Sequence, residues 1–204
     1  MCCTKGKYHL MGSLETTYKH HIEQSAQVYL SGDPGQKVDT MLRHHIRDRI
    51  MQWVRGPEII EMGAAELTWT EEVIERFGHS TIVDGSGYLL RHAEATYGAK
   101  VACYESLFEN FTPPDGKRFQ TVIATHVLEH VYEPVQVLRH CHEWLAPGGR
   151  MIVIVPNATS IHRRLGVKMG TLQTVYDFTE RDVQLGHQRV YDLDRLKSDR
   201  KSVV

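Results

Sequence analysis

Short apolar runs alternate with helix-like segments through the middle of the chain, and this alternation limits the possible folds more than any other feature. Five apolar runs are expected to be strands, near residues 58–62, 80–84, 100–104, 120–125 and 150–156. The helices expected between them cover residues 70–77, 87–97 and 133–146. Apolar strands that alternate with helices build a mostly parallel sheet with helices on both faces. The sequence therefore predicts an α/β, Rossmann-like, doubly wound fold.

Residues 1–54 precede this pattern and are predicted to form an N-terminal helical segment that packs on a core domain of residues 55–204. The segment contains two helix-like stretches, at 14–30 and 38–54, which are separated by turn-forming residues. In the second stretch apolar residues recur at helical spacing. We therefore expect one packed face made of Val38, Met41, Leu42, Ile46, Ile50 and Trp53.

The chain changes character again after Pro156. Residues 157–190 are polar and contain several glycines, so we expect them to form a lid or an insertion. Their basic side chains are expected to be solvated, with a contact to an acidic substrate as the alternative: Arg163, Arg164 and Lys168. Residues 192–204 are predicted to begin a last helix.

Composition argues against several classes of protein. The formal net charge is -1, which does not favour non-specific binding to nucleic acid. The sequence contains no run of about eighteen apolar residues, so no membrane span is predicted. The N-terminus lacks the apolar core of a secretion signal. The cysteines show no CxxC spacing, which favours a reduced, cytoplasmic location. Neighbouring histidines point about 100° apart on a helix, so no metal site is predicted.

Two features at the ends of the first two strands point to a nucleotide-like ligand. After Glu61, the small residues Gly63, Ala64 and Ala65 would let a ligand approach the backbone closely. Asp84 ends the second strand, where a carboxylate can accept hydrogen bonds from both hydroxyls of a ribose. Each feature alone is also compatible with an ordinary strand–helix loop.

Four blocks of sequence resemble the class I S-adenosylmethionine-dependent methyltransferases, in particular small-molecule enzymes of the ubiquinone-biosynthesis type. The blocks are EMGAAEL (61–67), VDGSGYLL (83–90), IATHVLEHVYEP (123–134) and LAPGGRMIVIVPN (145–157). A later stretch, GHQRVY (186–191), resembles the segment before the last helix of that group. In the first block, Ala65 and Leu67 stand where the family usually has glycine.

The resemblance implies a seven-stranded sheet that ends in an antiparallel hairpin. Because the sequence accounts for five strands, we expect that hairpin to be missing and the chain to be cut short, with an artificial tail at residues 199–204. The edge of the fifth strand would then be unpaired, so both a monomer and a homodimer are considered.

The resemblance also implies a site for S-adenosyl-L-methionine. The cofactor-binding residues carried over are Glu61, Gly63, Ala64, Ala65, Asp84, Gly85, Ser86, Leu107, Phe108, Thr125 and His126. The candidate bases are His126 and His130, although His130 is also expected to fix its loop by bonding the backbone. His187, Arg189 and Tyr191 alternate along the chain, so in an extended segment they would share one face towards the acceptor.

The function implied by the resemblance is methyl transfer to a small-molecule acceptor, with the methylated atom undetermined. A catalytically weak or inactive methyltransferase-like binding domain is the alternative. A nicotinamide-dependent oxidoreductase is disfavoured because the fingerprint GxGxxG is absent.

Overall fold

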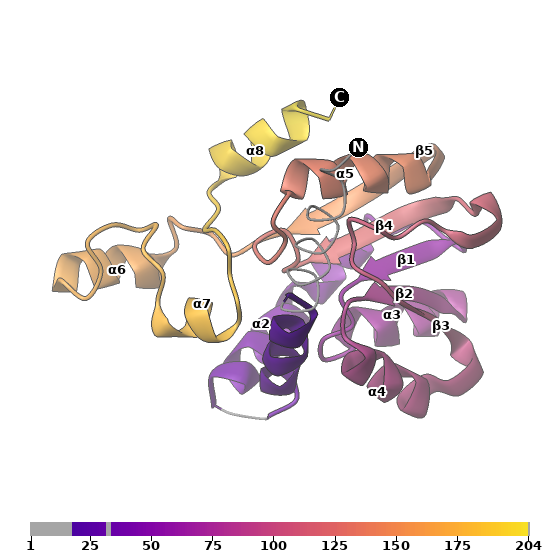
Figure 1. Cartoon of the computed structure of the whole chain (residues 1–204), viewed down its shortest axis with the longest axis horizontal. Coiled ribbons are helices and arrows are strands. Elements are labelled where there is room, and N and C mark those ends of the chain that lie inside the picture. The colour runs from indigo at the N-terminus through magenta and orange to yellow at the C-terminus, as the bar shows by residue number, and fades with distance from the viewer. Residues whose placement is uncertain (1–17, 32–33, 204) are drawn as a thin grey trace, which may run out of the picture.

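The computed structural model describes residues 18–31 and 34–203, whose core is one five-stranded sheet (Figure 1). The strands are β1 Ile59–Met62, β2 Ser80–Asp84, β3 Val101–Glu105, β4 Phe119–Thr125 and β5 Leu145–Ile154. All neighbouring strands pair in parallel, in the order β3-β2-β1-β4-β5. The strand order reverses between β1 and β4, and such a reversal opens a binding crevice at the carboxyl ends of the strands. The predicted five-stranded α/β fold is confirmed.

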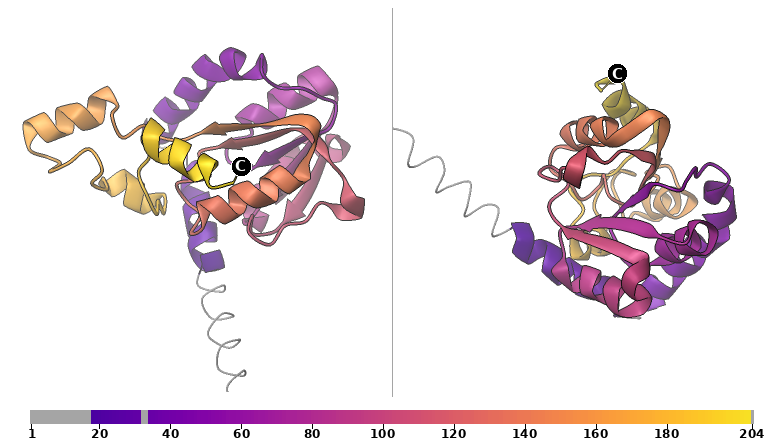
Figure 2. Two further views of the ribbon diagram at one scale, coloured as in Figure 1. Left: turned by 90° about the horizontal axis from the view of Figure 1, so that it is seen from above. Right: turned by 90° about the vertical axis from the view of Figure 1, so that its right-hand side faces the viewer.

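Helices cover both faces of this sheet (Figures 1 and 2). The helices are a segment over residues 18–29, α2 Pro34–Met51, α3 Thr68–Phe77, α4 Gly87–Tyr97, α5 Pro134–Trp144, α6 Ile161–Met169, α7 Glu180–Gln184 and α8 Leu193–Lys201. Two short 3-10 turns, η1 Gly98–Lys100 and η2 Pro114–Gly116, precede β3 and β4. Within the described ranges, none of the helices is long and apolar enough to cross a membrane.

The central strand β4 shows why the apolar runs are continuous. Val122 and Ala124 pack in a cluster with Trp144 of α5, whereas Ile123, between them in sequence, packs with Met51 of α2 on the opposite face. Successive side chains of a strand point to opposite faces, so a strand covered on both faces must be apolar at every position.

The structure corrects the predicted face of α2. Four of the residues assigned to that face are between 52% and 63% exposed: Val38, Met41, Leu42 and Trp53. The helix packs through its later turns, where Ile46, Ile50 and Met51 contact the cluster that contains Trp69 and Val73 of α3. Helical spacing identified residues that share a face, but it could not show how far the opposing surface extends. Residues 14–17 of the first predicted helix lie outside the described residues.

Two further boundaries differ from the expectations. Helix α5 ends at Trp144 and β5 begins at Leu145. Pro147 and Gly148 therefore lie in β5 and not at the end of the helix. The segment at residues 157–190 contains α6 and α7, which project beyond the end of the sheet (Figure 2). Arg163 of α6 is only 4% exposed, so the expectation that it is solvated was wrong.

The turn between β1 and α3 has a backbone that glycine adopts most easily. Gly63, Ala65 and Leu67 have φ values of 83°, 35° and 61°. These are the three positions at which the resembling family usually has glycine. A side chain at positive φ places Cβ too close to the backbone and costs about 1–2 kcal/mol per residue. The chain therefore adopts this positive-φ turn with a glycine at only one of the three positions.

Replacing Ala65 with glycine should consequently leave the free energy of unfolding unchanged or raise it by up to about 1 kcal/mol, because glycine relieves the steric cost. Chemical denaturation monitored by circular dichroism measures this. The control is Ala95→Gly, at an exposed position within α4, which should lower the free energy of unfolding by about 1 kcal/mol. An equal loss at both positions would contradict the strain in the turn.

Candidate functional site

A cavity of about 430 Å³ lies at the carboxyl ends of the strands, within the range of about 300–1,000 Å³ that is usual for small-molecule sites. It brings together most of the residues predicted from sequence: Glu61, Gly63, Ala64, Ala65, Asp84, Gly85, Leu107, Phe108, Thr125, His126, His130 and His187. Three others are not part of its lining: Ser86, Arg189 and Tyr191.

Asp84 holds the turn after β1 against the end of β2. Its Oδ2 accepts the backbone N–H of Ala64 at 2.7 Å, and its Oδ1 accepts the backbone N–H of Ser86, also at 2.7 Å. A carboxylate has about four acceptor positions, so two remain for a ligand. Burial raises the pKa of Asp84 to about 6, although the two backbone hydrogen bonds act to lower it.

Ser86 acts at the start of α4 and not in the cavity wall. Its hydroxyl accepts the backbone N–H of Leu89 at 3.3 Å, which caps the helix, and it donates to the Glu23 carboxylate at 2.7 Å. A capping serine satisfies one of the free N–H groups in the first helical turn. Glu23 lies in the helix over residues 18–29, so this contact joins that helix to the loop that follows β2.

Glu61 is 1% exposed and lines the cavity. Thr70 donates its hydroxyl to Glu61 Oε2 at 2.5 Å. Burial nevertheless raises the pKa of Glu61 to about 8, and the nearby carboxylates of Asp84 and Glu66 act in the same direction. A buried carboxyl without a cationic partner is costly to ionise, and a positive group placed beside it removes that cost. The position therefore suits the ammonium of an amino acid.

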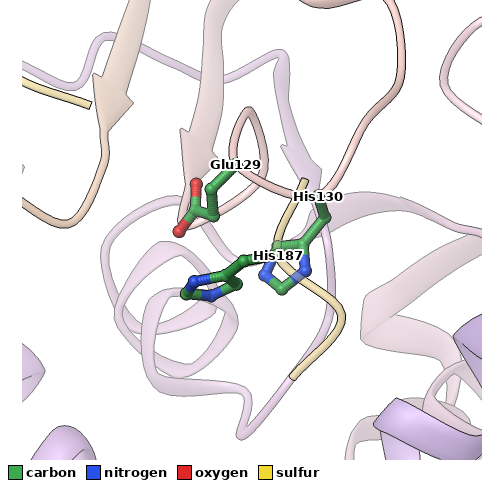
Figure 3. Close-up of side chains that lie close together, drawn as sticks. All are labelled: Glu129, His130 and His187. Atoms are coloured by element: carbon green, nitrogen blue, oxygen red, sulfur yellow. The ribbon is translucent and has the colours of Figure 1, made fainter. Parts of the chain in front are cut away.

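Three histidines, His126, His130 and His187, also line the cavity, and the carboxylate of Glu129 lies beside them. Figure 3 shows Glu129, His130 and His187 close together, and a ligand atom of each lies within 4.8 Å of the others. Glu129 is 1% exposed, and His126 Nδ1 lies 3.3 Å from Glu129 Oε1. Burial acts to raise the pKa of Glu129, but the contact with His126 and the other adjacent histidines hold it below its usual value.

His130 is engaged on two sides by the protein. Its Nε2 lies 3.2 Å from the hydroxyl of Tyr29, and the ring also bonds the backbone of Leu185. Burial lowers the pKa of His130 to about 4, despite the neighbouring Glu129 carboxylate. These contacts agree with the expectation that His130 fixes its loop.

His187 enters the cavity from the segment that follows α7. Its Nδ1 lies 2.8 Å from Asp182 Oδ1, and its ring packs edge-on against His130 with the centroids 4.7 Å apart. Asp182 in turn pairs with the buried Arg163, whose Nη2 lies 2.6 Å from Asp182 Oδ2. Sequence reasoning missed Asp182, because neither its spacing nor its neighbours resemble a known motif.

The two residues predicted to share a face with His187 have other contacts. Arg189 donates to three backbone carbonyls, those of Leu128, Val131 and Tyr132, and so fastens the loop after β4. Tyr191 is 2% exposed, packs in the main core and donates its hydroxyl to Asp199 at 2.7 Å. Of the three, only His187 reaches the cavity.

The helix over residues 18–29 supplies a wall that sequence reasoning did not anticipate. The lining residues from this helix are Tyr18, His21, Ile22, Ser25, Ala26 and Tyr29. Tyr18, Ile22, Ser25 and Tyr29 follow one another at intervals of three or four, so they occupy one face of a helix. That spacing was the available signal, although it predicts only a shared face and not what the face covers.

Comparison with known proteins agrees with this geometry. The family model described as a methyltransferase domain matches residues 38–200. A curated ubiquinone biosynthesis O-methyltransferase from Caulobacter sp. (strain K31) is 34% identical over 92 residues, which cover 43% of this chain and 36% of the relative. The matched region thus spans about a third of that curated relative.

Solved structures show the same fold at low sequence identity. A SAM-dependent methyltransferase from Archaeoglobus fulgidus has a TM-score of 0.60 at 17% identity, with 80% of this chain and 68% of that chain covered. A methyltransferase from Bacillus halodurans C-125 has a TM-score of 0.59 at 16% identity, covering 76% and 67% of the two chains. Since the family model covers most of the sequence, the chain belongs to the methyltransferase domain family.

Proposed function

We propose that this protein transfers a methyl group from S-adenosyl-L-methionine to a hydroxyl oxygen of a small molecule. One observation carries the proposal. A single cavity combines a nucleotide-type strand end, with Asp84 and the turn at Gly63, and a group of imidazoles suited to moving a proton. Methyl transfer to a hydroxyl needs a binding site for the methyl donor and a base for the hydroxyl proton. The strand end would provide the first and the imidazoles the second.

The cofactor half fits S-adenosyl-L-methionine in its chemistry. Glu61 would face the ammonium of the methionine part, and the turn at Gly63 and Ala64 would lie beside its backbone atoms. Asp84 would use its two remaining acceptor positions for the ribose hydroxyls. Leu107 and Phe108 would contact the adenine ring. When bound, this group supplies a methyl carbon attached to a positively charged sulfur.

The acceptor half is built by histidines and by aromatic side chains. A hydroxyl becomes a good nucleophile only when its proton is taken, and positioned bases contribute about 10²–10⁴-fold to such steps. His126, His130 and His187 line this part of the cavity, together with Tyr18 and Tyr29. The printed name of the curated relative also describes an O-methyltransferase. These observations support oxygen as the acceptor atom and a small molecule as the acceptor.

The proposal is tested by incubating the protein with S-adenosyl-L-methionine and separate panels of phenols, catechols, sugars, amines and thiols. Mass spectrometry measures methylated product and S-adenosylhomocysteine. We expect turnover in the hydroxyl panels. Turnover confined to amines or thiols would contradict O-methylation. Tight binding of S-adenosylhomocysteine without turnover in any panel would favour the alternative of a binding domain.

Asp84→Asn should weaken the binding of S-adenosylhomocysteine by about tenfold or more. A hydrogen bond to a charged group contributes about 1.5–3 kcal/mol, and each 1.4 kcal/mol corresponds to a factor of ten. Isothermal titration calorimetry measures the affinity, and thermal unfolding checks that the variant is folded. Asp115→Asn, at an exposed position before β4, is the control and should bind with unchanged affinity.

Binding of S-adenosylhomocysteine near pH 6.5 should release a proton from Glu61. The free protein holds Glu61 mostly protonated there because its pKa is raised to about 8. An ammonium beside the carboxyl favours the ionised form, so the pKa falls on binding and the proton leaves. The binding enthalpy should therefore depend on the ionisation enthalpy of the buffer. This dependence should shrink in Glu61→Gln; an equal dependence in both proteins would exclude Glu61 as its source.

A further inference from the structure

Among the three cavity histidines, His187 has the ring whose orientation is most firmly fixed by a carboxylate. Its Nδ1 lies 2.8 Å from Asp182 Oδ1, and its backbone N–H also bonds the Asp182 carbonyl at 2.9 Å. The side chains of His187 and Asp182 are 8% and 7% exposed. An Nδ1–H that donates to a carboxylate leaves Nε2 as an unprotonated acceptor, which is the form that a general base requires.

Asp182 is itself held from its other oxygen. Oδ2 accepts hydrogen bonds from the backbone N–H and the hydroxyl of Thr179, at 2.7 and 2.6 Å, and from Arg163 Nη2 at 2.6 Å. Arg163 is anchored by donating Nη1 to the carbonyls of Val175 and Asp177. The carboxylate can therefore neither rotate nor exchange its two oxygens without breaking several hydrogen bonds.

His126 and His130 are less suited to act as a general base. His130 already contacts Tyr29 and the Leu185 backbone. His126 Nδ1 lies 3.3 Å from Glu129 Oε1, a longer contact than the 2.8 Å between His187 Nδ1 and Asp182 Oδ1, so the tautomer of His126 is held less firmly.

We propose that His187 is the general base for the acceptor hydroxyl and that Asp182, anchored by Arg163, is the residue that positions it. This inference rests on the proposed O-methylation. The acceptor oxygen forms a bond to the methyl carbon while the carbon–sulfur bond breaks and its electron pair stays on sulfur. The hydroxyl proton passes to Nε2 of His187. His187 then carries the positive charge that sulfur has lost, and it returns the proton to water.

Glu129 provides an electrostatic reason for this assignment. Its carboxylate is buried and lies in the same small cluster as the His187 ring. Burial acts to raise the pKa of Glu129, but the adjacent histidines hold it below its usual value, so the group remains a carboxylate. A buried negative charge of this kind stabilises an imidazolium that forms beside it.

Asp182→Asn gives a sharp test because the geometry predicts which way the amide will face. The three donors around Oδ2 require an oxygen, so the amide NH₂ must take the place of Oδ1 and donate to His187 Nδ1. His187 is then forced into the Nε2–H tautomer and has no lone pair for the acceptor. Long-range ¹H–¹⁵N NMR on protein saturated with S-adenosylhomocysteine should show the Nδ1–H tautomer in the wild type and the Nε2–H tautomer in the variant.

Kinetics with the fastest hydroxyl acceptor from the panels provide the second measurement. Asp182→Asn and His187→Gln should each lower kcat by about 10²–10⁴-fold and remove the acidic limb of the pH profile. His187→Gln can still donate to Asp182, so it retains the contact and loses the base. The affinity for S-adenosylhomocysteine should change less than about twofold in both variants. Asp194→Asn, at an exposed position in α8, is the control and should match the wild type.

Several results would overturn the inference. These are an Nε2–H tautomer in the wild type, an unchanged tautomer in Asp182→Asn, or an acidic limb that survives in His187→Gln but disappears in His126→Gln. Loss of turnover with EDTA that Mg²⁺ or Zn²⁺ restores would instead make Glu129, His130 and His187 a cation site. If no hydroxyl panel shows turnover, the proposed function fails, whereas the NMR measurement still decides whether Asp182 sets the tautomer.

Discussion

The arrangement of the site depends on the Asp84 carboxylate, which accepts backbone N–H groups from two turns at once. One oxygen holds Ala64 in the turn after β1, and the other holds Ser86 at the start of α4. These turns follow neighbouring parallel strands, so the carboxylate joins two loops that the sheet already places side by side. The positive-φ turn at residues 63–67 and the first turn of α4 are thereby fixed relative to each other.

Buried acidic groups distinguish this end of the sheet from the rest of the core. Glu61 and Asp84 are 1% and 5% exposed, and burial raises the pKa of both. Ala65 and Leu67 add backbone strain in the same turn. Features that oppose folding concentrate at functional sites, where the surrounding structure must compensate for them. Here β1, β2 and β4, buried on both faces, provide that compensation.

The sequence predicted the sheet and also which residues at the strand ends line the cavity, for a physical reason. Buried parallel strands need uninterrupted apolar runs, and the motif residues from Glu61 to Asp84 lie where those runs end. The other walls of the cavity were harder to predict. The pair formed by Arg163 and Asp182 joins residues nineteen positions apart across α6 and α7, and its charges suggested a solvated surface. The wall formed by residues 18–29 required knowledge of how that helix docks, which its periodicity does not contain.

The walls of the cavity come from different kinds of structure, and this difference has a consequence for specificity. Strand ends and the turns after them form one wall, whereas residues 18–29 and 183–188 cover the cavity without contributing a strand. Substitutions in those two outlying pieces can alter which molecule is recognised while leaving the sheet undisturbed. Selectivity for the proposed acceptor can therefore diverge among related chains that share the same strand ends.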